Sequence, residues 1–374
     1  METSKSTLTV AQEALKAGQE SLRNYRRRKS PKKFTQPQLF ACLVVKEFRR
    51  LDYRGIWVLL QEWSELRNIL GLKKVPHFTT LWAAHKRLLA KPKAEALLDG
   101  VLQRCRQAKI LGKRTPLAAI DSTGLESRHV SAYYTQRCQR HKGHYKSRYS
   151  KLSAIGDTAN HLILGSEMDR GPQPDLAEAR PTVCAALSHQ SLGALLGDPG
   201  YEAEDFHRFC RLRDIRSIIP TTDRGRPRAD GQPHTVRGYY RRLMKSHFPK
   251  VLYGQRWQAE TIFSMLKRNF GSALRARSYH SQNREIRLRI LTHNLGILMR
   301  PWRQIMSPQV TPCFIQSRRL TNSEPSRRTR PAVSCLEITA APAISRLHPR
   351  VLAPTMTPGK GGYYEQEWRT TGSE

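Results

Sequence analysis

Four polar side chains recur at helical spacing in the stretch 253–267. Steps of three, four and seven residues separate Tyr253, Arg256, Glu260 and Lys267. Because an α-helix turns about 100° per residue, all four fall within about 60° of one another on a helical wheel. Apolar residues of the same stretch fall on the opposite side, where they can face a core: Ile262, Met265 and Leu266. We therefore expect one helix whose polar face holds a carboxylate, a phenol and two cations.

Two aspartates are placed to join that carboxylate in a metal site. Asp121 ends the apolar run PLAAID, and Asp198 ends the run ALLGD. A short apolar run before a turn is typical of a buried strand, so we expect each aspartate near the end of a strand. Carboxylates from adjacent strand ends and a nearby helix can converge on a divalent cation, and Mg²⁺ prefers such oxygen ligands. The candidate catalytic and metal-binding residues are therefore Asp121, Asp198 and Glu260.

Each of these acids also has an ordinary structural explanation. An Asp after a strand commonly caps a turn or a helix. A Glu between Arg and Lys on a helix commonly forms an ion pair. Several other acids compete for the catalytic role, and spacing alone leaves the choice open: Glu126, Asp157, Asp169, Glu202 and Asp205.

The charge of the chain favours nucleic acid as its partner. Lys and Arg total 65 against 30 Asp and Glu, a net charge of +35 over 374 residues. The excess extends from Arg26 to Arg350 and is not confined to one tail. Phosphate backbones supply the matching negative field. Arg256 and Lys267 could then bind the phosphates that flank a cleaved bond.

Cysteine usage and hydropathy indicate where the protein works. The seven cysteines form no C-x-x-C pair, so we expect reduced thiols and neither a zinc site nor a disulfide framework. No apolar run approaches the roughly 18 residues of a membrane span. The N-terminus lacks the apolar region of a secretory signal. We therefore expect a cytoplasmic protein without membrane contact.

The sequence divides into four regions that must position the candidate residues. Residues 1–33 are polar, end in a basic cluster and predict a flexible arm. Residues 34–110 are helical in pattern and form either a DNA-binding module or a scaffold. Residues 111–303 read as a mixed α/β domain, with a basic insertion loop over 221–250. Residues 304–374 lose all periodicity and are rich in Pro, Ser, Thr and Arg, so we expect them to be disordered.

Within the α/β region the order of elements is strand, hairpin, strand, helix, strand and helix. The first strand ends near Asp121, and a hairpin turns at residues 157–160. Residues 181–187 and 202–211 are helical in pattern, and the latter follow the turn at Asp198. A strand over 215–219 is followed by the helix that starts at Tyr253, and another helix over 281–300 completes the region.

These motifs together resemble one known family. The chain is similar to the DDE-type transposases of bacterial insertion sequences that carry a Y-x2-R-x3-E-x6-K signature. Every position of that signature is matched, by Tyr253, Arg256, Glu260 and Lys267. The segment AIDST around Asp121 resembles the first acidic motif of the family, and GDPGY around Asp198 resembles the second. The resemblance covers roughly residues 34–300.

The resemblance implies an RNase H-like catalytic domain and a mobile-element enzyme that depends on Mg²⁺, with Mn²⁺ as an alternative and two ions per site. Such enzymes bind terminal inverted repeats, act as endonucleases at the element ends and join the 3′-hydroxyl ends to target DNA. The family implies a homodimer on DNA, associated with the bacterial nucleoid. Metal binding would fall to Asp121, Asp198 and Glu260, and DNA contact to Tyr253, Arg256 and Lys267.

Two other functions are compatible with the same residues. One is a catalytically silent, transposase-derived protein that only binds DNA. The other is an RNase H-like, structure-specific nuclease that cuts DNA without joining ends.

Overall fold

A computed structural model describes residues 6–29, 31–127, 136, 149–222 and 236–299 of the chain. All of these belong to one compact unit, residues 1–309. The tail expected to be disordered, from residue 304, lies outside the described residues. None of the helices in these ranges is long and apolar enough to cross a membrane.

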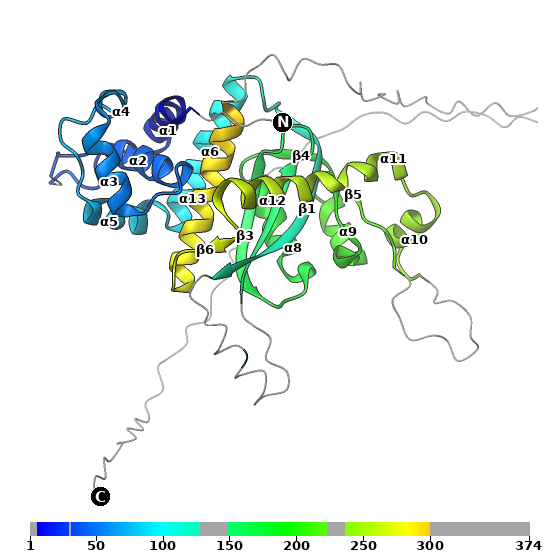
Figure 1. Cartoon of the computed structure of the whole chain (residues 1–374). Helices are drawn as coiled ribbons and strands as arrows, with labels where there is room; N and C mark the ends of the chain where they lie inside the picture. The colour runs from blue at the N-terminus through cyan, green and yellow to red at the C-terminus, as the bar shows by residue number, and fades with distance from the viewer. Residues whose placement is uncertain (1–5, 30, 128–135, 137–148, 223–235, 300–374) are drawn as a thin grey trace, which may run out of the picture. The chain divides into compact units, whose positions relative to one another are not determined.

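A group of helices precedes the sheet (Figure 1). Its members are α1 (Thr7–Ser21), α2 (Gln36–Phe48), α3 (Tyr53–Glu62), α4 (Ser64–Ile69), α5 (Phe78–Leu88) and α6 (Lys91–Gln107). The expected flexible arm over residues 1–33 is wrong for α1, which packs against α2 and α6. Its apolar residues recur at helical spacing and are fully buried, so they anchor the helix: Val10, Ala11, Ala14 and Ala17.

The sheet is mixed, as the sequence predicts. It contains β1 (Arg114–Ser127), β2 (Tyr149–Asp157), β3 (Ile163–Gly171), β4 (Ser191–Leu196) and β5 (Arg216–Ile218), in the order β3-β2-β1-β4-β5. The first three strands are antiparallel, and β4 and β5 run parallel to β1. A short strand, β6 (Ala273–Leu274), pairs with the end of β1.

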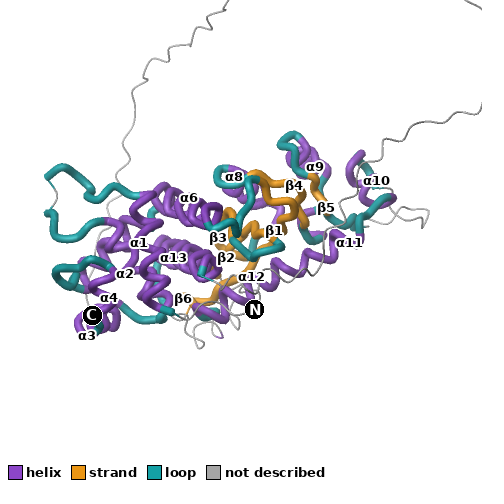
Figure 2. Tube along the Cα trace, turned by 90° about the horizontal axis from the view of Figure 1, so that it is seen from above, coloured by secondary structure: helices purple, strands orange, loops and turns teal. Residues whose placement is uncertain are grey.

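Helices cover both faces of this sheet. Figure 2 shows α8 (Asp175–Leu187) and α9 (Glu204–Arg211) on one face and α12 (Trp257–Phe270) on the other. The long helix α13 (Tyr279–Leu298) contacts both β2 and the N-terminal helices α2 and α6. It therefore joins the helical group to the sheet.

The face under α12 is lined by small and branched apolar residues. Ala119, Leu196 and Ile218, from three neighbouring strands, pack with Ala259 of α12 in one buried cluster. Gly156 of β2 provides room for the same helix, because a Cβ at this position would lie 2.2 Å from Cδ1 of Ile262. These contacts fix the height of α12 above the sheet.

Three sequence-based boundaries need correction. Strand β1 continues past Asp121 because β2 pairs with it as far as Leu125, so Asp121 lies within the strand and not at its end. The basic loop expected over 221–250 contains two short helices, α10 (Tyr239–Ser246) and the start of α11 (Lys250–Tyr253). Helix α8 begins at Asp175, six residues before the expected start.

The helix expected over residues 253–267 is also interrupted. Tyr253 ends α11, the 3-10 turn η2 (Gly254–Arg256) follows, and Glu260 and Lys267 lie in α12. The backbone angles stay right-handed helical at Tyr253, Gly254 and Arg256. The polar face therefore continues across the junction, although the stretch is not a single α-helix.

Candidate active site

Asp121 and Asp198 lie side by side at the position where β4 ends next to β1. Ala119 of β1 lies opposite Leu196 of β4, and each aspartate is two residues further along its own chain. Because side chains alternate along a strand, Asp121 lies on the same face as Ala119, which is the face that α12 covers. The register of the two strands thus brings the two candidate acids together, as the sequence predicts.

Arg256 connects these strands to the third acid. Its Nη1 lies 2.5 Å from Oε1 of Glu260, and its Nη2 lies 3.5 Å from Oδ2 of Asp121. Burial alone would lower the pKa of Arg256, but the negative charges of Asp121, Glu260 and Asp198 raise it. One guanidinium therefore pairs with two of the predicted acids and interacts electrostatically with the third.

Asp121 is the most perturbed of these carboxyls. Burial raises its pKa to about 6, although a 2.8 Å hydrogen bond from the Ser122 backbone N–H and the charge of Arg256 act in the opposite direction. The carboxylates of Asp198 and Asp175 raise this pKa further. The site consequently carries more negative charge than Arg256 compensates.

The chemistry of these side chains fits a hard divalent cation. Carboxylate oxygens are the ligands that Mg²⁺ prefers, and an added cation would neutralise the excess charge around Asp121. In the part of the chain that the structure describes, however, no three His, Cys, Asp or Glu side chains lie close enough together to hold a metal ion. Glu260 is 62% exposed and paired with Arg256, so it must leave that pair to join the other two acids.

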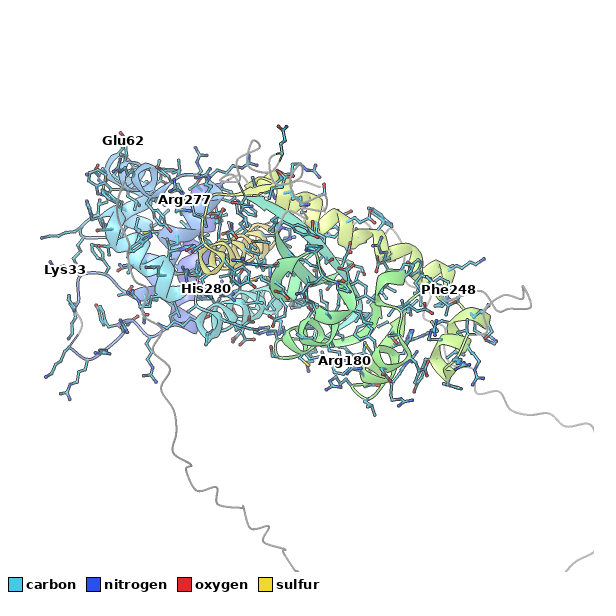
Figure 3. The ribbon with its side chains drawn as sticks, turned by 90° about the horizontal axis from the view of Figure 1, so that it is seen from below. Lys33, Glu62, Arg180, Phe248, Arg277 and His280 are labelled. Carbon is cyan, nitrogen blue, oxygen red and sulfur yellow. The ribbon has the colours of Figure 1, made fainter. Side chains whose placement is uncertain are left out.

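The remaining residues of the polar face have different surroundings. The ring of Tyr253 makes an edge contact with Phe248, labelled in Figure 3, at 4.9 Å between centroids, and it packs against the cluster under α12. Burial raises the pKa of Tyr253. Lys267 is partly exposed and lies two turns beyond Glu260 on α12, about 10 Å along the helix axis.

The ordinary structural roles considered for the acids are also present. Asp198 accepts a hydrogen bond from the Gly200 N–H at 2.9 Å and so caps the 3-10 helix η1 (Pro199–Tyr201). Among the competing acids, Asp157 accepts the Ala159 N–H at 2.8 Å in the β2–β3 turn. Glu202 binds Arg241 at 2.8 Å. These two acids are therefore engaged in local structure.

Sequence reasoning missed one acid of this site. Asp175, the first residue of α8, accepts a hydrogen bond from Ser122 Oγ and is one of the charges that raise the pKa of Asp121. The late predicted start of α8 left Asp175 in a loop. A proline followed at once by an acid, with a second acid three residues later, is a helix-start pattern that could have found it.

One family model matches the part of the chain that carries these residues. Residues 112–295 match the family described as the transposase DDE domain, a span that contains Asp121, Asp198 and Glu260. No curated protein sequence matches the chain.

Solved structures show looser similarity. A chain of a simian T-cell lymphotropic virus intasome in complex with PP2A regulatory subunit B56 gamma is 14% identical, with a TM-score of 0.21. The match covers 64% of this chain and 74% of that chain. A pre-cleavage Mos1 transpososome and a Mos1 paired-end complex with the left transposon end are each 8% identical with TM-scores of 0.20, and 66% of this chain covers 82% of theirs. TM-scores this low support no conclusion, so the assignment depends on the domain match and the sheet topology. Residues 112–295 match the transposase DDE domain, and the mixed sheet that they form has an RNase H-like fold.

Proposed function

We propose that the protein is an insertion-sequence transposase that binds terminal inverted repeats, cleaves DNA at the element ends and joins the 3′-hydroxyl ends to target DNA. Asp121, Asp198 and Glu260 would be the catalytic and metal-binding acids. Tyr253, Arg256 and Lys267 would contact the DNA next to the cleaved bond. One observation carries the proposal: acids from β1, the turn after β4 and α12, far apart in sequence, all interact with a single guanidinium, two by ion pairs and Asp198 through its charge.

The proposed roles follow from the charge of each side chain. The three carboxylates would hold Mg²⁺ or Mn²⁺, which would supply charge neutralisation and activation of a water or 3′-hydroxyl. Arg256 would exchange its carboxylate partners for a DNA phosphate, to which a guanidinium can donate two hydrogen bonds. Lys267, about 10 Å along α12, would bind a phosphate further from the cleaved bond.

The regions outside the site are assigned by the same proposal. Residues 34–110 would bind DNA or support the catalytic domain of residues 111–303. The net charge of +35 supplies the electrostatic attraction for an extended DNA contact. Two element ends must be held together for strand transfer, which favours a homodimer on DNA, in the bacterial cytoplasm at the nucleoid.

The experiment that tests the function compares Glu260→Ala with the wild-type protein on labelled element-end DNA, a target plasmid and Mg²⁺. We expect Glu260→Ala to abolish end cleavage and to leave binding of the element end largely intact. Glu62→Ala is the matched control, because Glu62 is an exposed glutamate on α3 and its loss should leave cleavage unchanged. Full cleavage by Glu260→Ala would overturn the proposed function, which assigns this residue to the metal site.

The wild-type reaction distinguishes the two rival functions. A catalytically silent DNA-binding protein binds the element-end DNA but does not cleave it in Mg²⁺ or Mn²⁺. A structure-specific nuclease releases cleaved ends but gives no covalent product with the plasmid. A transposase gives both cleaved ends and end–plasmid joints.

A further inference from the structure

Asp175 lies at the centre of a partly buried polar network on the α8 side of the sheet. Lys151 of β2, whose side chain is 4% exposed, places Nζ 2.9 Å from Oδ1 of Asp175 and 3.4 Å from Oε1 of Glu178. The same Nζ donates to the Gln173 carbonyl at 2.8 Å. A buried ammonium with three oxygen partners holds the Asp175 carboxylate in one place.

The fixed carboxylate is linked to the candidate active site through one residue. Asp175 accepts a hydrogen bond from Ser122 Oγ. The backbone N–H of Ser122 in turn donates to Oδ1 of Asp121 at 2.8 Å. Adjacent residues of a strand point to opposite faces, so Ser122 connects α8 on one side of the sheet to Asp121 on the other.

A second contact places Asp175 beside the other strand acid. A Cβ added to Gly200 would lie 3.0 Å from Oδ1 of Asp198 and 3.4 Å from Oδ2 of Asp175. The two carboxylates thus lie close to the same point beside Gly200. Burial raises the pKa of the Tyr201 phenol, and the charges of Asp175, Asp121 and Asp198 raise it further. All three acids therefore border one small region of the structure.

We propose that Asp175 is a positioning residue for this site, which orients the Asp121 carboxylate for metal binding through the hydrogen bond to Ser122. The inference rests on the proposed function for the identity of the metal-binding acids. Asp175 would not bind the ion itself; it would limit the rotation of Asp121 by fixing the residue that donates to Oδ1. Loss of an outer partner of a metal ligand typically lowers metal affinity by about 10- to 100-fold.

The test is a titration of the DNA-free protein with Mn²⁺, in which the free ion is measured by electron paramagnetic resonance. We expect Asp175→Ala to weaken Mn²⁺ binding by about 10- to 100-fold. On element-end DNA it should lower kcat and leave KM for DNA near the wild-type value. Glu178→Ala is the matched control, because Glu178 shares Lys151 but makes no contact with Ser122. It should lower thermal stability and leave Mn²⁺ affinity unchanged.

Two further variants keep the inference testable if Asp175→Ala folds poorly. Ser122→Ala removes the same link from its other end and should weaken Mn²⁺ binding similarly, and combining it with Asp175→Ala should add little, because both act on one path. Asp175→Asn keeps an oxygen that can accept from Ser122 and should recover most of the affinity.

Each outcome decides between distinct conclusions. Wild-type Mn²⁺ affinity and kcat in folded Asp175→Ala overturn the positioning role, and an inactive Glu260→Ala would then still support the transposase. Failure of Asp175→Asn to recover affinity also overturns it, because the charge of Asp175 would then act directly. An active Glu260→Ala removes the proposed function, whereas the Mn²⁺ titrations still decide whether Asp175 orients Asp121.

Discussion

The guanidinium of Arg256 pairs with Glu260 at 2.5 Å, one helical turn away, while its other terminal nitrogen reaches Asp121 at 3.5 Å. The cation thus stands between two acids that the proposed function assigns to metal binding. Glu260 can join Asp121 and Asp198 in one metal site only after its ion pair with Arg256 breaks. DNA could open it, because a phosphate offers Arg256 an alternative partner.

Arg256→Gln is expected to raise the affinity of the DNA-free protein for Mn²⁺. The substitution removes a positive charge from the acids and releases Glu260 from its pair. Since Glu260 is largely exposed, the pair is worth only about 0.2–1 kcal/mol, so we expect a gain of up to about fivefold. The same variant should bind element-end DNA more weakly, with a shallower dependence on salt.

Mn²⁺ titration and DNA binding at several salt concentrations measure these two effects. Arg268→Gln is the control, because Arg268 lies on the same helix and its side chain contacts Ser264. It should leave Mn²⁺ affinity at the wild-type value. An unchanged or lower Mn²⁺ affinity in Arg256→Gln would contradict the competition between Arg256 and the ion.

Much of this site follows from local sequence patterns, and the rest depends on contacts between distant segments. The acids Asp198 and Glu260 are placed by an apolar run before a turn and by helical spacing, which are local features. The position of Asp121 within β1 is not a local feature, because pairing with β2 extends the strand through polar residues. The helix start at Asp175 is a local feature, but its role depends on distant segments, because its partners Ser122 and Lys151 lie on β1 and β2.

For α1, which lies in the segment expected to be a flexible arm, the prediction failed for a different reason. Polar and basic residues dominate residues 1–33, which favours an unfolded segment when composition is averaged. The alanines and Val10 that occupy one side of α1 bury against α2 and α6. Small residues contribute little to an apolar pattern but allow close helix packing, so the periodicity was weak while the packing is tight.

Gly165→Ala is expected to destabilise the fold more than Gly156→Ala. A Cβ at Gly165 would lie 2.3 Å from the backbone nitrogen of Ala186 in α8, so the helix itself has to move. At Gly156 the obstructing atom is the end of the Ile262 side chain, which can change rotamer. We expect a loss of about 1–3 kcal/mol in the free energy of unfolding for Gly165→Ala and less than about 1 kcal/mol for Gly156→Ala.

Urea unfolding of the two variants and the wild-type protein checks this order. Equal losses would mean that α8 adjusts its distance from β3 as easily as Ile262 turns. The comparison is independent of the proposed function, because neither glycine contacts the candidate acids.

Arg289→Met is expected to lower the free energy of unfolding by about 3–5 kcal/mol. Arg289 of α13 is almost fully buried, and it binds Glu47 of α2 at 3.2 Å and Glu285 at 2.8 Å. Removal of the guanidinium leaves Glu285 without a cation among the described residues, with only the backbone N–H groups of Arg275 and Ala276 as donors. It leaves Lys46 as the remaining cation for Glu47. The helical group and the sheet domain would lose one of the contacts that α13 provides between them.

Adding Glu47→Gln to Arg289→Met provides the control. The second substitution removes one of the two negative charges that Arg289 neutralises, so the double variant should regain part of the lost stability. Thermal or urea unfolding measures both variants. Full additivity of the two losses would show that the charges do not interact.

His85 is expected to make the protein less stable below neutral pH. Burial lowers the pKa of His85 to about 3, and the cations Lys46 and Arg284 lower it further; Tyr53 makes an edge contact with the imidazole. The unfolded chain has a His pKa near 6.5, so it binds the proton first as pH falls. The contribution of neutral His85 is therefore complete above about pH 6.5 and is lost as pH falls from about 6.5 towards 3.

Between pH 7.5 and pH 5.0 this histidine should account for a loss of about 2 kcal/mol in the free energy of unfolding. Urea unfolding at both pH values for wild type and His85→Gln isolates the effect, because the Gln variant cannot take up the proton and should show a smaller loss. The exposed His247→Gln is the control and should keep the wild-type pH dependence. If His85→Gln also kept the wild-type pH dependence, protonation of another group would have to explain the acid sensitivity.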